Sequence, residues 1–129
     1  MSNVEVIKEL YRAFAAKDYE AFRRICHPDL EWIQNPGFPN GGHHRGAEDV
    51  IAKVFQRFNT DWREWRYVIE EYLDAGATMI VIGYYEGVHG QTGKPFHSAA
   101  AHVYDLRDGK LIRFRQFADT KVIWDAMGE

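Results

Sequence analysis

The sequence predicts an α+β fold in which helices cover one face of a curved, mostly antiparallel sheet. Apart from one short strand pattern, apolar residues in the first 58 positions recur with helical spacing. After residue 60 apolar and polar residues alternate with a period of two. The predicted order is therefore helix, helix, strand, helix, four antiparallel strands and a short helix. No repeat, low-complexity segment or linker interrupts residues 1–129, so we expect one domain.

The first two helices are predicted from their caps and their apolar spacing. Ser2 and Glu5 have the spacing of a capping box, which satisfies free backbone N–H groups at a helix start. The apolar stripe that follows consists of Val6, Ile7, Leu10, Tyr11 and Phe14. Asp18 can cap a second, shorter helix. We expect Pro28 to end it, because proline disfavours the helical conformation in the residue before it.

A strand, a loop and a third helix are predicted next. "DLEWIQN" (29–35) is the strand, and the loop "NPGFPNGGHHRG" (35–46) is rich in turn residues. This loop is either a lid over a pocket or an ordinary exposed loop. Its adjacent histidines should diverge, and no third ligand stands at a recognisable spacing, so we expect no metal site. "AEDVIAKVFQRF" (47–58) is the third helix, with acidic residues in its first turn.

Four strands and a closing helix follow. The strands are predicted at 63–76, 77–90, 94–109 and 110–118, and the second, nearly all apolar, should be central. Gly83 within that strand indicates either a close approach of a ligand or curvature of the sheet. Asp108-Gly109 is the strongest hairpin turn in the chain. Residues 119–128 form the short helix, with Asp119 or Thr120 as its cap.

The composition excludes several classes of protein. The net charge is -3 and the basic residues are scattered, so we expect no nucleic-acid partner. No apolar run approaches the ~20 residues of a membrane span, and the N-terminus lacks a secretion signal. Cys26 is the single cysteine, which fits a buried structural thiol in a reducing compartment. We therefore expect a cytoplasmic protein without a membrane partner.

Two polar residues on adjacent predicted strands are the candidate catalytic groups. In "FHSAAAHVYDL" the alternation places His102 on one face with small residues, which leave room for a pocket beside its ring. A core histidine bonded to a neighbouring strand is the alternative. In "KLIRFRQFA" Gln116 shares a face with Ile112, Phe114 and Ala118. A buried amide there needs hydrogen-bond partners.

No cofactor or metal motif is present. The chain has no glycine-rich phosphate loop, no nucleophile elbow and no zinc-ligand pair on a helix. An enzyme of this sequence would use acid–base or electrostatic chemistry on a small molecule without a bound cofactor.

The whole chain resembles the SnoaL-like polyketide-cyclase family of the nuclear-transport-factor-two-like (ketosteroid-isomerase-like) superfamily. The resemblance is carried by the order of elements and by "CHPDLEW", "GYYEG", "TGKPF" and "AHVYDLRDGKLIRFRQFADT". It implies a cone-shaped α+β barrel, with the sheet wrapped around three N-terminal helices and a short C-terminal helix. It also implies a homodimer joined through the outer face of the sheet, where Arg113, Arg115 and Phe117 would lie.

The acid–base residues of the superfamily are not complete in this chain. Polyketide cyclases pair a histidine with an aspartate on the last strand; His102 matches the histidine, but Gln116 stands at the aspartate position. The steroid-isomerase positions correspond to Asn35, Leu10 (beside Tyr11) and His102. The limonene-type epoxide-hydrolase positions correspond to Tyr85, Gly83 and Gln116, so that set is absent. An amide accepts no proton at neutral pH, whereas His102 is expected to titrate near pH 7.

Three functions stay open at this point. The first is an isomerase- or cyclase-like enzyme acting on a small, largely apolar carbonyl compound, with His102 as acid–base and Gln116 polarising the oxygen. The second is a protein that binds such a ligand without turnover, and the third is a dimeric scaffold with a vestigial pocket. The predicted pocket residues are Tyr11, Phe14, Trp32, Asn35, Tyr85, Ser98 and Phe114.

Overall fold

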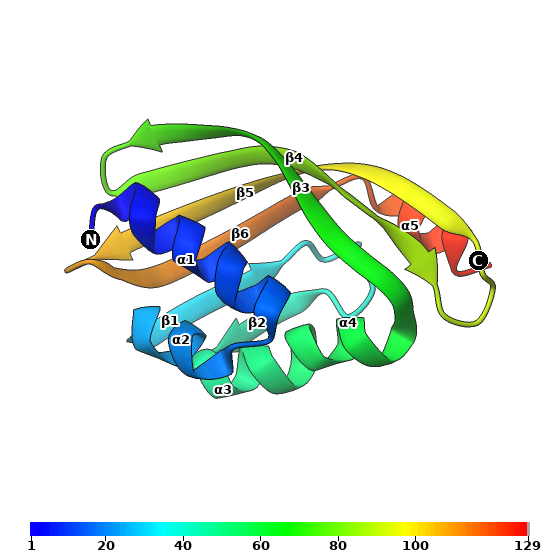
Figure 1. Cartoon of the computed structure of the whole chain (residues 1–129), viewed down its shortest axis with the longest axis horizontal. Helices are drawn as coiled ribbons and strands as arrows, with labels where there is room; N and C mark the ends of the chain where they lie inside the picture. Colours follow the sequence, from blue (N-terminus) through cyan, green and yellow to red (C-terminus); the bar gives the residue numbers. More distant parts are fainter. Residues whose placement is uncertain (129) are drawn as a thin grey trace.

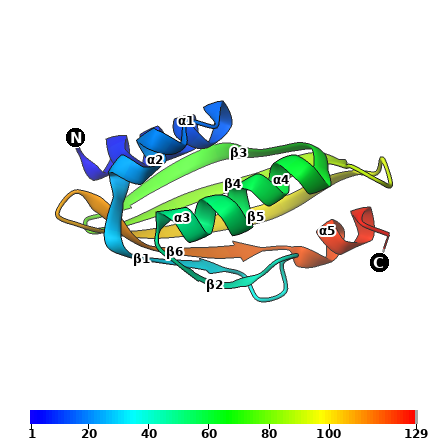
Figure 2. The same ribbon diagram turned by 90° about the horizontal axis from the view of Figure 1, so that it is seen from below.

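The computed structural model describes residues 1–128 and has one six-stranded sheet that curls around helices. The helices are α1 (Asn3–Ala16), α2 (Tyr19–Ile25), α3 (Ala47–Val50), the π-helical turn η1 (Ile51–Phe55), α4 (Gln56–Asp61) and α5 (Thr120–Ala126). The strands are β1 (Cys26–Gln34), β2 (Gly42–Arg45), β3 (Trp62–Ala75), β4 (Thr78–His89), β5 (Pro95–Arg107) and β6 (Lys110–Ala118). Helices α1 to α4 gather on one side of the sheet, and α5 extends beyond its far end (Figures 1 and 2). This is the predicted α+β cone.

The sheet order is β2-β1-β6-β5-β4-β3. Every pair is antiparallel except β1 and β6, which run parallel. The prediction that residues 77–90 form the central strand was wrong, because β4 lies one place from the edge and β5 and β6 occupy the middle. Strand β4 is nearly all apolar because its inner side chains are buried and its outer ones are half-buried.

The predicted caps of the helices are confirmed. Ser2 and Glu5 form the capping box of α1, and the Asp18 carboxylate accepts a hydrogen bond from the Ala21 N–H at the start of α2. Helix α2 runs to Ile25, as its apolar spacing predicted, but Pro28 does not end it, because the chain enters β1 already at Cys26. Pro28 therefore lies inside β1, where the pairing with β6 shifts register between Cys26 and Glu31.

The loop between β1 and α3 is more ordered than its composition indicates. Residues 42–45 form β2 and pair with β1, so His43 and His44 belong to an edge strand. The preceding turn buries Phe38, whose ring lies 5.6 Å from that of Trp65 and 5.9 Å from that of Tyr85. This part of the loop therefore closes one end of the cone. The third helix also differs from expectation, because η1 interrupts it.

Two irregularities of the sheet decide which side chains face inward. Asp105 pairs with Arg113 and Leu106 pairs with Leu111, so Ile112 is an extra residue in β6. This bulge turns Leu111 into the core and Ile112 outward, which corrects the predicted inward face. At Gly83 an added Cβ would lie 2.1 Å from the Val68 carbonyl oxygen, so the glycine accommodates the close approach of β3.

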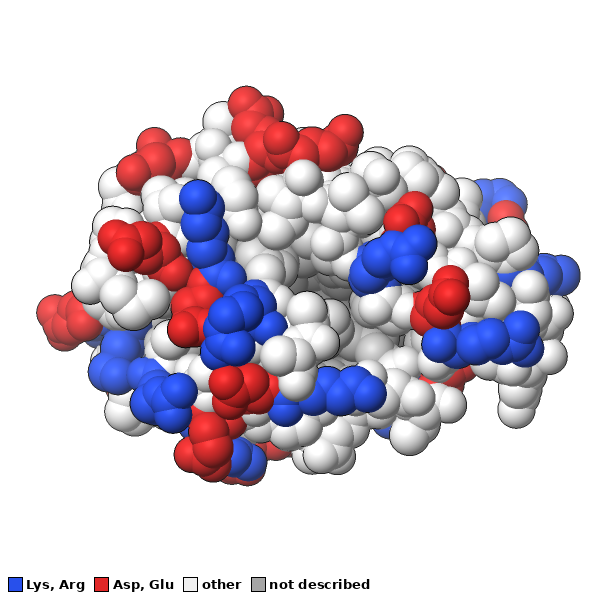
Figure 3. Space-filling view, in the orientation of Figure 1, with Lys and Arg blue, Asp and Glu red and all other residues white. Residues whose placement is uncertain are grey.

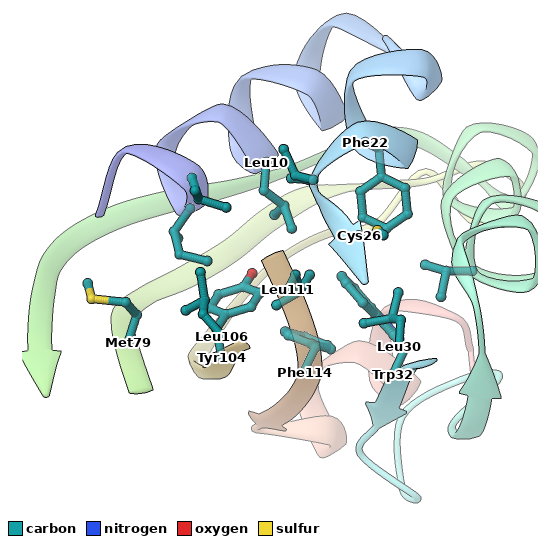
Figure 4. Close-up of a cluster of buried hydrophobic side chains, with 14 of the residues drawn as sticks. Leu10, Phe22, Cys26, Leu30, Trp32, Met79, Tyr104, Leu106, Leu111 and Phe114 are labelled. Carbon is teal, nitrogen blue, oxygen red and sulfur yellow. The ribbon is translucent and has the colours of Figure 1, made fainter. Parts of the chain in front are cut away.

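The main core fills the narrow part of the cone between α1, α2 and the inner face of the sheet (Figure 4). Figure 4 shows Leu10 of α1 pointing toward Tyr104 and Leu111 of the strands and Phe22 of α2 pointing toward Trp32 of β1. The rings of Trp32 and Phe114 stack at a centroid distance of 3.9 Å. This packing holds the strand residues that carry the polar groups described below.

Candidate functional site

A cavity lies inside the cone between α1, the helical segment 47–61 and the sheet. Its volume is about 40 Å³. It is lined by Leu10, Tyr11, Phe14, Trp32, Gln34, Val54, Phe55, Phe58, Trp65, Tyr67, Tyr85, His102, Tyr104 and Phe114. The residues that line it include no Lys, Arg, Asp or Glu, so its walls are aromatic and uncharged apart from a few polar tips.

A wider outer space lies next to this cavity. It measures about 240 Å³ and is formed by the end of α1, by α4 and by the start of β3. The molecular surface is hollowed near the middle of the face on which α1 lies (Figure 3). Phe14, Phe58 and Trp65 line both the outer space and the inner cavity. These three rings are therefore the wall between the two spaces.

His102 lies at the centre of a ring of tyrosines. Its imidazole is 5% exposed and stacks on Tyr67 at a centroid distance of 4.1 Å. Its Nδ1 lies 2.7 Å from the hydroxyl oxygen of Tyr11, and its Nε2 lies 2.6 Å from that of Tyr85. The Tyr104 hydroxyl donates to Tyr11 at 2.9 Å. Both ring nitrogens are thus engaged by phenols from α1 and β4.

Gln116 is held in one amide orientation beside this ring of tyrosines. The backbone N–H of Asn35 donates to Gln116 Oε1 at 3.1 Å, and an N–H group can only donate. The amide nitrogen therefore faces Tyr85, to which it donates at 2.8 Å. Gln116 and His102 are cross-strand partners. Gln116 does not line the cavity and reaches it only through Tyr85.

Counting hydrogens in this network leaves one donor without a partner. Tyr11, Tyr85, Tyr104 and neutral His102 carry one O–H or N–H hydrogen each, which makes four. Three short links join these groups, and a longer contact between the Tyr104 hydroxyl and Nδ1, at 3.4 Å, can only share a hydrogen that already serves one of these links. If Nδ1 of His102 carries the proton, the spare hydroxyl hydrogen belongs to Tyr11. If Nε2 carries it, the spare hydrogen belongs to Tyr85. Both tyrosines line the cavity, so in either tautomer the spare hydroxyl hydrogen belongs to a residue of its wall.

The expectation that His102 titrates near pH 7 was wrong. Burial lowers the pKa of His102 to about 3, because the charged imidazolium would lose its hydration without gaining a carboxylate. Burial also raises the pKa values of Tyr11, Tyr85 and Tyr104 above the usual tyrosine value. At neutral pH the ring of tyrosines and the imidazole are therefore uncharged hydrogen-bonding groups.

Of the predicted pocket residues, five line the cavity and two do not. Tyr11, Phe14, Trp32, Tyr85 and Phe114 line it. Asn35 lies behind Gln116, and its side-chain amide donates to the Ala118 carbonyl oxygen at 3.3 Å. Ser98 is fully buried, and its hydroxyl donates to the Asp119 carbonyl oxygen at 2.7 Å. Both contacts support the chain around the start of α5 rather than a ligand.

Replacing Ser98 with alanine should therefore affect stability and not ligand binding. The change leaves the Asp119 carbonyl oxygen without this donor, and we expect the free energy of unfolding to fall by about 1 kcal/mol. Urea denaturation measures this effect. A change in ligand affinity comparable to that produced by the tyrosine variants described below would contradict the structural role.

Sequence reasoning missed several residues of the cavity wall, among them Gln34 and Tyr67. Gln34 is 3% exposed and follows Trp32 with the period of a strand, so the alternation in "EWIQN" could have identified it in place of Asn35. Tyr67 alternates in the same way with Trp65. Its hydroxyl donates to the carbonyl oxygens of Val81 and Ala100, so its role is to stack on His102.

The remaining features of the described chain concern metals, the thiol and membranes. Residues 1–128 contain no group of three His, Cys, Asp or Glu side chains arranged to hold a metal ion. Burial raises the pKa of the Cys26 thiol to about 12, as expected of a structural cysteine. Within the same range, none of the helices has the length and apolar character needed to cross a membrane.

Comparisons with known proteins agree with the cone-shaped α+β fold. The model of the SnoaL-like domain family matches residues 7–114. No match was found among curated proteins. A solved structure of an NTF2-like protein from Burkholderia thailandensis E264 is 32% identical, with a TM-score of 0.93 over 98% of each chain.

Two further solved structures share the fold at lower identity. TerC, co-crystallised with polyporic acid, is 25% identical, with a TM-score of 0.87 over 98% of each chain. IdmH, a proposed polyketide cyclase from Streptomyces antibioticus, is 20% identical, with a TM-score of 0.83 over the full length of each chain. The latter comparison concerns the fold alone.

Proposed function

This chain belongs to the SnoaL-like domain family, and we propose that it binds a small, largely apolar carbonyl compound and polarises its oxygen with a tyrosine hydroxyl. The observation that carries this proposal is the spare hydroxyl hydrogen of Tyr11 or Tyr85 in an otherwise aromatic cavity. A carbonyl oxygen is an acceptor that such a donor can satisfy, and the aromatic walls suit an apolar body. The co-crystallisation of TerC with polyporic acid supports a small organic ligand for this fold.

His102 and Gln116 are positioning residues in this proposal. A base with a pKa of about 3 is a weak proton acceptor at neutral pH, and both nitrogens of His102 are already hydrogen-bonded. Gln116 holds the Tyr85 hydroxyl from the other side and cannot accept a proton. The contacts therefore favour a binding and polarising site over an acid–base enzyme.

The binding proposal is tested with a ketone and a hydrocarbon of the same shape. We expect 4-isopropylacetophenone to bind more tightly than 1,4-diisopropylbenzene, as measured by tryptophan fluorescence and calorimetry. The double variant Tyr11→Phe/Tyr85→Phe should lose about 2- to 10-fold of this preference, the effect of one hydrogen bond. Tyr84→Phe is the matched control, because Tyr84 neighbours Tyr85 in β4 and faces the opposite side of the sheet. An unchanged preference in the double variant would refute the proposed donor.

Exchange of α-protons separates binding from turnover. The methyl ketone protons of 4-isopropylacetophenone exchange with D₂O when the ketone enolises, which NMR follows directly. We expect no acceleration by the protein, because no group of suitable pKa reaches the ligand. Acceleration that disappears in His102→Phe would instead favour the isomerase- or cyclase-like enzyme.

A scaffold with a vestigial pocket is the second candidate, favoured by the small volume of the cavity. The inner cavity, at about 40 Å³, is far smaller than ligand pockets, which usually measure at least ~300 Å³. A ligand must therefore displace the wall of Phe14, Phe58 and Trp65. Failure of both the ketone and the hydrocarbon to bind the folded protein would favour the scaffold.

A homodimer and a cytoplasmic location complete the proposal. The outer face of the sheet carries Phe117, which is 54% exposed, and Arg113, which pairs with Asp105 at 2.7 Å. Arg113 also lines an open groove of about 680 Å³. Light scattering of wild-type protein and Phe117→Asp tests whether this face joins two copies. The free, buried thiol of Cys26 is compatible with a reducing compartment.

A further inference from the structure

Gln34 presents amide hydrogens to the interior of the cone. It is the last residue of β1 and is 3% exposed. The indole Nε1–H of Trp32 donates to Gln34 Oε1 at 2.9 Å. Because an indole N–H can only donate, this contact fixes which end of the amide is the oxygen. The amide nitrogen must then point away from Trp32.

The hydrogens on that nitrogen have no acceptor among residues 1–128. The one side-chain hydrogen bond of Gln34 is the contact from Trp32. Gln34 lines both the inner cavity and an adjoining space of about 20 Å³ beneath the turn that contains Phe38. Gln34 Nε2 is not among the fully enclosed side-chain atoms that lack a partner, so it borders one of these two spaces and is free to donate into it. An amide in this position is suited to donating a hydrogen bond to a bound ligand.

The orientation of Gln34 is set before any ligand arrives. Trp32 stacks on Phe114 with an interplanar angle of 29°, and its ring also packs edge-on against Phe22 at a centroid distance of 6.0 Å. These contacts hold the indole, and the indole holds the amide oxygen. A ligand that accepts a hydrogen bond from Gln34 therefore binds without the free-energy cost of reordering this side chain.

We propose that Gln34 donates to a second acceptor oxygen of the ligand, so that the site selects uncharged molecules with an oxygen at each end of an apolar body. This inference rests on the proposed function, in which the tyrosine beside His102 holds the first oxygen. The ligand is uncharged because no Lys, Arg, Asp or Glu lines the inner cavity. Its body is apolar because the rest of the inner cavity is lined mostly by aromatic and aliphatic side chains, Phe55 and Val54 among them.

The test compares two ketones that differ only in the second oxygen. 1,4-Diacetylbenzene has a carbonyl at each end, whereas 4-isopropylacetophenone replaces one acetyl group with an isopropyl group of the same shape. We expect wild-type protein to prefer the diketone by about 2- to 10-fold. Gln34→Met keeps the shape and removes the donor, so it should reverse the preference. Gln34→Glu keeps an acceptor for the Trp32 indole but has no N–H donor, so it should abolish the preference for the diketone. Gln91→Met, at an exposed glutamine, is the control.

The outcomes separate this inference from the proposed function. If wild-type protein binds both ketones equally and Gln34→Met changes nothing, the role of Gln34 is refuted and the carbonyl site stands. If neither ketone binds, the proposed function fails, and the inference fails with it. NMR of the Gln34 side-chain amide in the unaltered protein gives a readout that needs no variant. The diketone should shift these amide signals more than the monoketone does, and equal shifts would overturn the inference.

Discussion

Replacing Phe114 with alanine is expected to lower the free energy of unfolding by about 3–5 kcal/mol, the usual cost of removing a buried aromatic ring. Phe114 is 2% exposed, stacks on Trp32 at 3.9 Å and lies 5.1 Å from both His102 and Tyr104, all as centroid distances. The surrounding rings belong to two strands and cannot all collapse into the space. Chemical denaturation measures the loss.

A residue three positions further along the same strand supplies the control. Phe117 is 54% exposed on the outer face, so Phe117→Ala should change the stability of the monomer by no more than about 0.5 kcal/mol. Equal costs for the two variants would contradict the assignment of inner and outer faces. Because Phe114 also lines the cavity, its replacement should enlarge the space beside His102.

Acidification from pH 7 to pH 5 is expected to destabilise the protein by about 2 kcal/mol through His102 alone. The pKa of His102 is about 3 when folded and about 6.5 when unfolded, so the unfolded chain binds more protons in this interval. Stability is therefore complete above the unfolded pKa and is lost as the pH falls toward 3. Thermal or urea unfolding across this range measures the slope.

The groups in contact with His102 do not titrate between pH 7 and pH 5, so the stability change that we assign to this site comes from the histidine. The titratable side chains in contact with it are tyrosines, which stay protonated throughout the interval. Carboxylates act at lower pH: a hydrogen bond from Arg12 lowers the pKa of Asp18, whose contribution is lost only below about pH 4. His102→Phe should flatten the slope between pH 7 and pH 5. His97→Phe, which alters an exposed histidine of β5 on the outer face, should leave it unchanged.

Regular periodicity predicted most of the elements of this fold. The capping box of α1, the four long strands and the short C-terminal helix follow from local patterns, of which the alternation of buried and half-buried or exposed residues in β4 and β5 is the most regular. The family resemblance supplied the curling of the sheet into a cone, and the sheet order and the likeness to a solved NTF2-like structure confirm it. The features that were missed depend on contacts distant in sequence. Strand β2 exists because residues 42–45 pair with β1, and its own composition is that of a loop.

The site was harder to predict because the properties of each residue depend on neighbours that are distant in the sequence. The pattern around His102 identified the histidine, but its low pKa results from burial among tyrosines that come from α1, β3, β4 and β5. Asn35 was chosen over Gln34 although the alternation with Trp32 favoured Gln34. The bulge at Ile112 has no sequence signal, because it arises from how β5 and β6 pair.

Phe58 lies in the walls of all three spaces inside and beside the cone, namely the inner cavity, the space beneath the Phe38 turn and the outer space. Its ring stacks on that of Trp65 at a centroid distance of 4.3 Å, and the residue lies in α4, three positions after the end of η1. We expect a molecule that enters or leaves the inner cavity to displace the Phe58 ring. The rate of entry would then be set by the motion of this aromatic side chain and not by affinity. Two ligands of very different strength would reach the tyrosines at similar speeds and differ mainly in how long they stay.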